Sequence, residues 1–308
     1  MTIRLPDGVL GMAGRDAEWG AWVGLLPRRV AEVLDEWELE VDGLLMHGYT
    51  ALVVPVRTAD GARAVVKLRF PGDDESEFEH LALRRWDGRG AVRLLRADPA
   101  RAAMLLERIG PDDLNALDDL AACEVIGQLY GDLHVPALPQ LRTLTSYVDR
   151  WLDSLAELPR DAPIPRRMVE QTLHLGRGLT SDPATIGTLI HGDLHYDNVL
   201  AADAGGWLTI DPKPMSGDPH YEPAPALWNR WRAATETGDI RAATRRRFHT
   251  IVDAAGLDEE RARDWVVVRM VLNANWSLED ARAEDRGLSA QDAEWITQCV
   301  TIAKAVQD

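Results

Sequence analysis

Hydrophobic and polar residues follow two different periods in the first third of the chain. Apolar side chains recur every three to four positions in two segments, which predicts amphipathic helices. Between and after them lie short runs rich in valine and leucine, typical of strands, and Asp60-Gly61 suits a hairpin turn. The expected elements are an extra N-terminal helix at 16–38, β-rich segments across 41–69, a helix at 75–86, and strands at 91–97 and 102–109.

The remainder of the chain has a mostly helical period, interrupted by a turn-rich, strand-like stretch at 188–220. A β-rich part followed by a helical part predicts an α+β protein with two lobes. We place the boundary at Gly110–Pro111, giving an N-terminal lobe of residues 1–110 and a helical lobe of residues 111–308. The expected helices are 113–134, 143–158, 166–180, 223–236, 240–255, 259–284 and 289–306.

Composition narrows the class of protein. The 308 residues are 46% hydrophobic and 27% charged, a balance typical of a soluble globular protein. The sequence shows neither an apolar run of about 18 residues nor the apolar core of a secretory signal, so no membrane association is expected. Its two cysteines, Cys123 and Cys299, lie far apart, which favours a reducing cytoplasm over a disulfide framework.

The formal net charge of −16 argues against nucleic acid as a partner and suits a cationic small molecule. Solubility alone is an equally good explanation of that charge. Only Lys67, Lys213 and Lys304 are lysines among the 34 basic residues, so a lysine here is retained where arginine does not serve.

Chemistry concentrates in HGDLHYDNVL at 191–200 and WLTIDP at 207–212. Phosphoryl transfer needs a carboxylate that accepts a proton from the attacking hydroxyl, and oxygen ligands for Mg²⁺. Asp193 and Asn198 have the five-residue spacing of a kinase catalytic loop, and Asp211 ends a short apolar strand. Turn and capping chemistry is one alternative. A hydrolytic metal run through His191, Asp193 and His195 is another, but it leaves Asn198 and Asp211 without a role.

These motifs resemble the aminoglycoside phosphotransferase family, most closely its streptomycin 6-kinase and hydroxyurea phosphotransferase branch. HGDLHYDN, IDPKP and GDPHYEPAPAL carry the resemblance, together with RAVVKLRFP upstream, and it extends over about residues 35–300. It implies a two-lobed, protein-kinase-like fold that uses ATP and Mg²⁺. It also implies phosphorylation of a hydroxyl on a small polar substrate.

The resemblance assigns roles to individual residues. Asp193 matches the catalytic base, and Asn198 and Asp211 match the magnesium ligands. Lys67 matches the lysine that holds the α- and β-phosphates, and Glu79 matches its helix partner, with Glu77 as a competing candidate. The backbone from Glu107 to Ile109 matches the segment that binds adenine.

The phosphate-binding turn departs from the protein-kinase pattern, because HGYTA at 47–51 has one glycine where three are usual. Gly48 can allow close backbone approach, and Thr50 can offer a hydroxyl or amide group to phosphate. The position between two strands, upstream of Lys67, supports this interpretation.

Substrate residues are expected in the helical lobe. Tryptophan faces can stack on rings or attract cations, and carboxylates can bind amines or guanidinium groups. Core packing for the tryptophans and solvated helix faces for the acids are the alternatives. The candidates are Trp228, Trp231, Trp276, Glu222, Glu279 and Asp280.

The sequence therefore predicts an ATP-dependent kinase of a streptomycin-type aminoglycoside. A kinase of hydroxyurea or another small hydroxylated metabolite is the alternative within this class. A catalytically silent, kinase-like binding module is the alternative outside it, and the complete set of Lys67, Asp193, Asn198 and Asp211 argues against that module.

Overall fold

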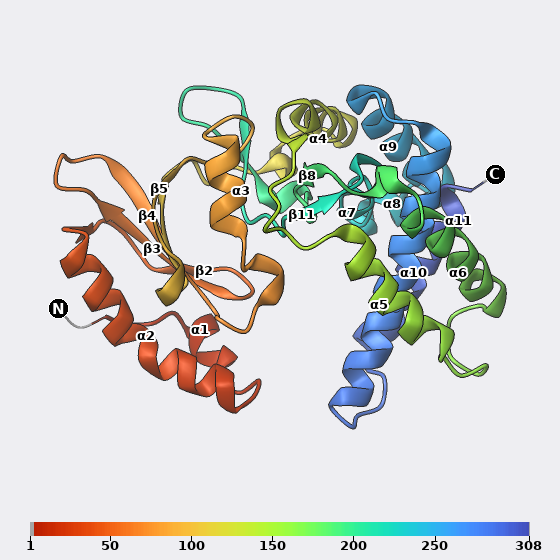
Figure 1. Ribbon diagram of the computed structural model, residues 1–308, viewed down its shortest axis with the longest axis horizontal. Helices are drawn as coiled ribbons and strands as arrows, with labels where there is room; N and C mark the ends of the chain where they lie inside the picture. Colours follow the sequence, from red (N-terminus) through yellow and green to blue (C-terminus); the bar gives the residue numbers. More distant parts are fainter. Residues whose placement is uncertain (1–2, 308) are drawn as a thin grey trace. The chain divides into compact units, whose positions relative to one another are not determined.

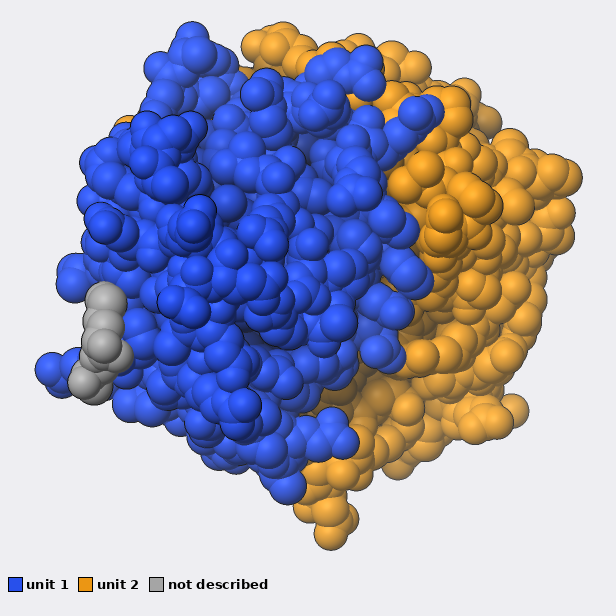
Figure 2. All heavy atoms as spheres, turned by 60° about the vertical axis from the view of Figure 1, so that its left-hand side comes forward, with its two compact units in different colours: residues 1–111, 202–211 blue, residues 112–201, 212–308 orange. Residues whose placement is uncertain are grey.

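The computed structural model describes residues 3–307 and divides into two compact units (Figure 2). The first unit comprises residues 1–111 and 202–211, and the second comprises residues 112–201 and 212–308. The first unit ends at Pro111 where the chain enters the second unit, and residues 202–211, which were expected in the helical lobe, belong to the first unit.

The first unit is built on an antiparallel sheet with strand order β1-β3-β4-β6-β5, and β2 also pairs with β3 (Figure 1). Asp60-Gly61 turns the chain between β3 and β4, and Gly61 has a φ of +86°, which suits glycine. The strands of this sheet are β1 (Glu40–Val41), β2 (Met46–His47), β3 (Ala51–Arg57), β4 (Arg63–Arg69), β5 (Leu94–Asp98) and β6 (Ala103–Glu107). The unit also contains β10 (Trp207–Thr209), which lies outside the sheet.

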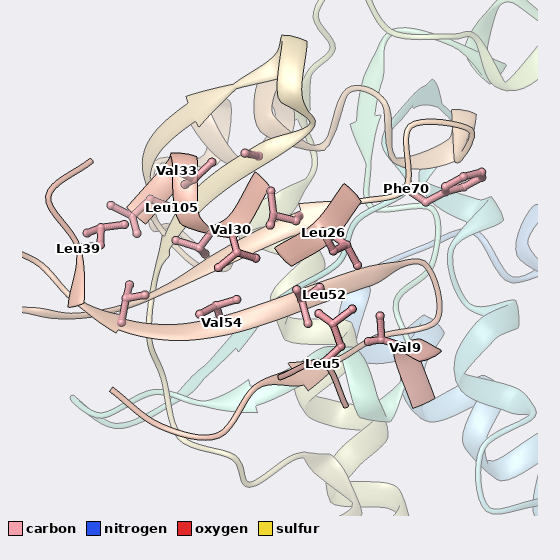
Figure 3. Packing of buried hydrophobic residues seen from close by; sticks show 14 of the residues in the cluster. Leu5, Val9, Leu26, Val30, Val33, Leu39, Leu52, Val54, Phe70 and Leu105 are labelled. Carbon is pink, nitrogen blue, oxygen red and sulfur yellow. The ribbon is translucent and has the colours of Figure 1, made fainter. Parts of the chain in front are cut away.

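Two N-terminal helices, α1 (Asp7–Met12) and α2 (Ala17–Glu36), pack on one face of this sheet (Figure 3). Asp16 caps α2 by accepting hydrogen bonds from the amides of Glu18 and Trp19. The buried stripe of α2 lies against inward-facing side chains of β3, β4 and β6. Members of this core include Val9, Leu26, Val30, Val33, Leu52, Val54, Val66, Leu68 and Leu105. The sheet therefore has a helical layer over one face, and α1 is an element that the hydrophobic pattern did not predict.

The second unit is mainly helical and contains a small sheet of order β11-β8-β7 (Figure 1). Helix α10 is its longest element, and 14 of its 25 residues are buried, so it forms the centre of this core. The helices are α4 (Asp119–Leu133), α5 (Leu144–Ala156), α6 (Arg166–Thr180), α7 (Ala224–Leu227), α8 (Trp231–Glu236), α9 (Ile240–Ala255), α10 (Glu259–Ala283) and α11 (Ala290–Ala305). The strands are β7 (Val135–Pro136), β8 (Thr188–Ile190), β9 (Val199–Ala201) and β11 (Met215–Gly217).

Three expected helices are shorter or divided. The helix expected at 75–86 is α3 (Glu79–Trp86), preceded by a 3₁₀ turn at Asp74–Ser76, where Asp73 caps the chain. The helix expected at 113–134 begins at Asp119, after the cap Asp118. That at 223–236 is split into α7 and α8, because Arg230 takes a left-handed conformation with a φ of +45°. Among residues 3–307, no helix has both the length and the apolar character needed to cross a bilayer.

Candidate active site

Lys67, Glu79 and Asp211 form one ionic network in the first unit. Strand β4 places Lys67 in the middle of the sheet, paired in register with Val53 and Met104. Its ammonium lies 2.7 Å from both carboxylate oxygens of Glu79, the first residue of α3, and 2.7 Å from Oδ1 of Asp211. The expected pair is therefore present, and segment 202–211 brings a second carboxylate to the same lysine.

The network holds one ammonium between two carboxylates, which keeps the lysine charged. Burial alone would lower the pKa of Lys67, but the carboxylates of Asp211 and Glu79 raise it above its ordinary value. Glu79 is only 1% exposed, whereas Glu77 is exposed, which decides between the two glutamates considered for the pair. A buried ammonium held between two carboxylates is a rigid, permanently charged group. It suits the binding of anionic phosphate.

Asp211 is held in an uncommon backbone conformation, with a φ of +57°. The preceding strand fixes its position, since Thr209 accepts a hydrogen bond from the amide of Val92 and donates one to the carbonyl of Gly90. Non-glycine residues in the left-handed region carry a local energy cost and cluster at functional sites. The conformation agrees with a functional role for this carboxylate.

The phosphate-turn residues differ in how they are engaged. The hydroxyl of Thr50 donates to Oδ2 of Asp73, 2.7 Å away, and its carbonyl accepts from the amide of Phe70. Gly48 is exposed, and an added Cβ would meet nothing within 4 Å. Packing therefore does not require a glycine at position 48, and its side chain is absent where a ligand can approach the backbone.

The segment proposed for adenine continues from β6. The amide of Glu107 donates to the carbonyl of Arg93, and its Oε1 accepts from the amide of Arg93. These contacts anchor the start of the segment to the chain before β5. Ile109 is half-buried. Backbone groups beyond Glu107 are thus the better candidates for hydrogen bonding to a base.

Asp193 and Asn198 lie on one loop of the second unit, between β8 and β9. The side-chain amide of Asn198 donates from Nδ2 to the backbone carbonyl of Asp193, 2.9 Å away. This bond closes the loop and leaves Asn198 with a carbonyl oxygen as its second polar atom. Asp193 is half-buried, as a base that must reach a substrate should be.

Glu222 holds the backbone of this loop through two hydrogen bonds. Its Oε2 accepts from the amide of His191 at 3.0 Å, and its Oε1 accepts from the amide of Gly192 at 2.7 Å. The side chain is 0% exposed. The expectation that Glu222 binds substrate is therefore wrong, because a fully buried carboxylate that accepts backbone hydrogen bonds is not available to a ligand.

Gly192 is required by the geometry of the loop. It has a φ of +81°, and an added Cβ would lie 2.2 Å from the carbonyl oxygen of Lys213. That segment is in turn bonded to the loop, since the amide of Lys213 donates to the carbonyl of His191. Only glycine allows these two stretches to approach so closely.

Arg269 of α10 is a buried residue beside this loop that the sequence interpretation missed. It is 6% exposed and donates from Nη2 to the carbonyl of Gly192, 2.5 Å away. Burial alone would lower the pKa of Arg269, but Tyr221 and Asp193 raise it. The guanidinium thus stays charged under the loop. A lone arginine within the apolar run WVVVRMVL was the available signal.

The two histidines of the possible hydrolytic metal run have separate contacts. Nδ1 of His191 lies 3.3 Å from the amide nitrogen of Asp193, and Nδ1 of His195 lies 3.2 Å from Oδ2 of Asp197. In the part of the chain that the structure describes, no group of three or more His, Cys, Asp or Glu side chains is arranged to hold a metal. The geometry does not support that alternative.

The remaining substrate candidates do not form one cluster. Trp276 makes edge contacts with Tyr147 and Trp151, with ring centroids 6.1 and 5.1 Å apart, whereas Trp228 contacts Trp295 at 5.6 Å. Trp231 begins α8 and is half-buried. Glu279 lies 3.1 Å from Arg282, and Asp280 is exposed. Their binding roles stay predictions.

Asn198 and Asp211 have the chemistry that a magnesium ion requires. One offers an amide oxygen, and the other has a carboxylate of which Oδ1 contacts Lys67 while Oδ2 is the second donor. Hard oxygen donors of this kind suit Mg²⁺. The two residues belong to different units, and Asp211 is the last residue of its unit before Pro212.

Comparison with known proteins identifies the family. Residues 36–281 match the family described as aminoglycoside/hydroxyurea antibiotic resistance kinase. The chain is 40% identical over 274 residues to a streptomycin 6-kinase of Streptomyces glaucescens, covering 86% of this chain and 87% of the relative. It is 41% identical over 278 residues to a hydroxyurea phosphotransferase of Kitasatospora aureofaciens, covering 88% and 77%.

Solved structures agree on the fold. The crystal structure of a thermostable mutant of aminoglycoside phosphotransferase APH(4)-Ia, in ternary complex with ADP and hygromycin B, aligns with a TM-score of 0.59. The two are 16% identical, and the alignment covers 90% of this chain and 98% of that one. The β-rich and helical parts thus form an α+β fold of the kind found in aminoglycoside phosphotransferases. The chain belongs to the aminoglycoside/hydroxyurea antibiotic resistance kinase family.

Proposed function

We propose that this protein transfers the γ-phosphoryl group of ATP to a hydroxyl of a streptomycin-type aminoglycoside, at the 6 position. The observation that supports this choice of substrate is the 40% identity to a streptomycin 6-kinase across most of both chains. The net charge of −16 supports a cationic acceptor, because negative potential raises the local concentration of cations.

Residues of the first unit are proposed to bind the phosphate donor. Lys67, fixed by Glu79, contacts the α- and β-phosphates and offsets their charge. The turn at Gly48 lets backbone groups approach the phosphates, since no side chain stands in the way. The backbone from Glu107 to Ile109 pairs with the adenine base.

Asp193 is proposed as the catalytic base. Its carboxylate orients the acceptor hydroxyl and accepts its proton as the oxygen forms a bond to the γ-phosphorus. The bond from that phosphorus to the β-bridging oxygen breaks, and ADP leaves with the electron pair. The loop is suited to this task, because hydrogen bonds with Glu222, Arg269 and Asn198 fix its backbone.

Mg²⁺ is proposed as the metal, held by the amide oxygen of Asn198 and the carboxylate of Asp211. When bound, it neutralises charge on the transferring phosphates. The ion pair of Asp211 with Lys67 keeps that carboxylate oriented.

Phosphorylation of hydroxyurea is the second candidate, favoured by the 41% identity to a hydroxyurea phosphotransferase. Both candidates require the same donor residues, so the acceptor decides between them. Streptomycin is a large cation and hydroxyurea is small and neutral, so only the former gains from the acidic character of the chain.

A single assay tests the proposal. ADP release is measured with streptomycin, other aminoglycosides and hydroxyurea, each at equal concentration, with and without Mg²⁺. We expect turnover with streptomycin and a product 80 Da heavier by mass spectrometry, with the phosphate located by ³¹P–¹H NMR. Turnover with hydroxyurea alone would establish the second candidate, and turnover with neither would reject both.

A further inference from the structure

We propose that Arg15 is a positioning residue that holds the phosphate turn, residues 47–51, in the conformation that binds ATP. The inference rests on the proposed role of this turn in phosphate binding. It assigns a task to the N-terminal helices beyond packing on the sheet.

Arg15 lies just before α2 and contacts the turn in two ways. Its Nη1 donates a hydrogen bond to the backbone carbonyl of Tyr49, 3.1 Å away. Its guanidinium carbon also lies 4.3 Å from the ring centroid of Tyr49 and 4.3 Å from that of Trp19. The cation is therefore shared by two aromatic rings, one from the helix and one from the turn.

The helical end of this contact is firmly anchored. The ring of Trp19 stacks on Phe70 with centroids 3.8 Å apart, and Trp22 meets Phe70 edge-on at 5.7 Å. The amide of Phe70 donates to the carbonyl of Thr50 at 2.8 Å. The turn is thus tied to the same aromatic group at both Tyr49 and Thr50.

The outer side of the turn borders a hollow and contacts the N-terminal helices a second time, through His47. A hollow of about 390 Å³ lies there, with Gly11, Met12 and Arg15 on one side and His47, Gly48 and Tyr49 on the other. Tyr49 is 80% exposed. The ring of His47 lies against Gly8, where an added Cβ would be 2.1 Å from Nε2. Arg15 therefore connects the N-terminal helices to the turn across this hollow.

This connection matters for ATP binding because an exposed turn must be ordered before it can hold phosphate. Fixing the backbone of one residue costs about 1–2 kcal/mol. A turn that is already fixed in the free protein does not lose this free energy when ATP binds. The sequence has one glycine in this turn and gains order from Arg15 and Tyr49.

The test compares Arg15→Ala, Tyr49→Ala and the double variant with Arg28→Ala, a control on the exposed side of α2 whose partner is Glu32. Each exposed cation–π contact is worth about 0.5–1 kcal/mol, so Arg15→Ala should raise KM and Kd for ATP about fivefold. The KM for the aminoglycoside and the melting temperature should change little. Tyr49→Phe should retain more ATP affinity than Tyr49→Ala, because it keeps the ring that contacts Arg15.

Two further readouts do not depend on turnover. Arg15→Ala should speed hydrogen exchange at the amide of Gly48, which donates to the carbonyl of Ala51 across the turn. The double variant should lose no more ATP affinity than the more strongly affected single variant, since both substitutions break the same contact between Arg15 and Tyr49. Wild-type ATP affinity and exchange in Arg15→Ala would overturn the inference while leaving the kinase assignment intact. A wild-type protein that neither binds nor consumes ATP would instead overturn the proposed function.

Discussion

The guanidinium of Arg269 donates a hydrogen bond to the backbone carbonyl of Gly192, the residue directly before Asp193. The adjoining amide of Gly192 donates to Glu222. A buried cation and a buried carboxylate thus hold the two polar groups of one residue. A fixed base needs no reorientation when the acceptor arrives.

Replacing Arg269 should uncouple turnover from ATP binding. Arg269→Met removes the donor to Gly192 and should lower kcat about tenfold to a hundredfold, because small displacements of a catalytic group are costly. KM for ATP should change less than threefold, since Arg269 belongs to the second unit and the proposed phosphate contacts to the first. Steady-state kinetics measure both values, and Arg166→Met, at an exposed position of α6, serves as the control. A rise in KM for ATP as large as the fall in kcat would contradict a positioning role.

Removal of the base should affect the chemical step alone. Asp193→Ala should lower kcat about a thousandfold, within the range for a lost general base. Binding of ATP should persist, because Lys67 and Glu79 are unchanged. Single-turnover kinetics and calorimetric titration with ATP test the two parts separately. A variant that retains near-normal turnover would exclude Asp193 as the base.

The metal-dependent part of ATP affinity should depend on Asp211. Asp211→Ala removes a proposed magnesium ligand and one of the two carboxylates at Lys67, so binding of MgATP should fall below detection in a calorimetric titration. The matched control is Asp203→Ala, an exposed carboxylate in the same segment that lies 3.8 Å from Arg63. Unchanged MgATP affinity in Asp211→Ala would count against the metal role.

Gly48 gives a separate test of the phosphate turn. Gly48→Ala should not alter the melting temperature, because the added methyl meets nothing within 4 Å. KM for ATP should rise about tenfold if the backbone approaches phosphate closely there. Gly24→Ala, in α2 and equally open around its Cβ position, should leave KM for ATP unchanged and should raise the melting temperature, because alanine favours a helix interior more than glycine does. A normal KM in Gly48→Ala would remove this residue from the site.

Glu222 should make stability depend on acid pH. Burial alone would raise the pKa of Glu222, but His134 and the backbone hydrogen bond from Gly192 lower it below its ordinary value. A lowered pKa in the folded state stabilises the protein above the unfolded value, about 4.3. That contribution is lost as pH falls through the folded value. Thermal unfolding of wild type between pH 7 and pH 3 should show this loss, and Glu222→Gln should show less of it. Equal pH dependence in both proteins would contradict the assignment.

The hydrophobic pattern was sufficient for most of the fold. Helices α5, α6, α9, α10 and α11 begin and end within two residues of expectation, because their apolar faces are long and regular. Short elements were less predictable. Helix α1 has six residues and only Val9 and Met12 buried, too few to establish a period. The membership of residues 202–211 in the first unit depends on long-range bonds to Gly90 and Val92, which local sequence does not encode.

The residues of the candidate site also differ in how far the sequence alone could identify them. Asp193, Asn198, Asp211 and Lys67 were recognisable because their chemistry and spacing are tightly constrained. Glu222 was assigned to substrate because a carboxylate in the helical lobe can bind an amine or a guanidinium group, whereas its complete burial decides its role. Arg269 lies 77 residues from Gly192, and only the fold brings such a pair together.

Segment 202–211 has a consequence for how the protein is made. Its bonds to Gly90 and Val92 complete the first unit, yet a ribosome synthesises it about 110 residues later, after residues 112–201 of the second unit. The nascent N-terminal part therefore remains unfinished while those residues emerge, and Asp211 reaches Lys67 only afterwards. Expression of residues 1–111 alone would yield a first unit that lacks this last segment, and the ammonium of Lys67 would have one carboxylate in place of two.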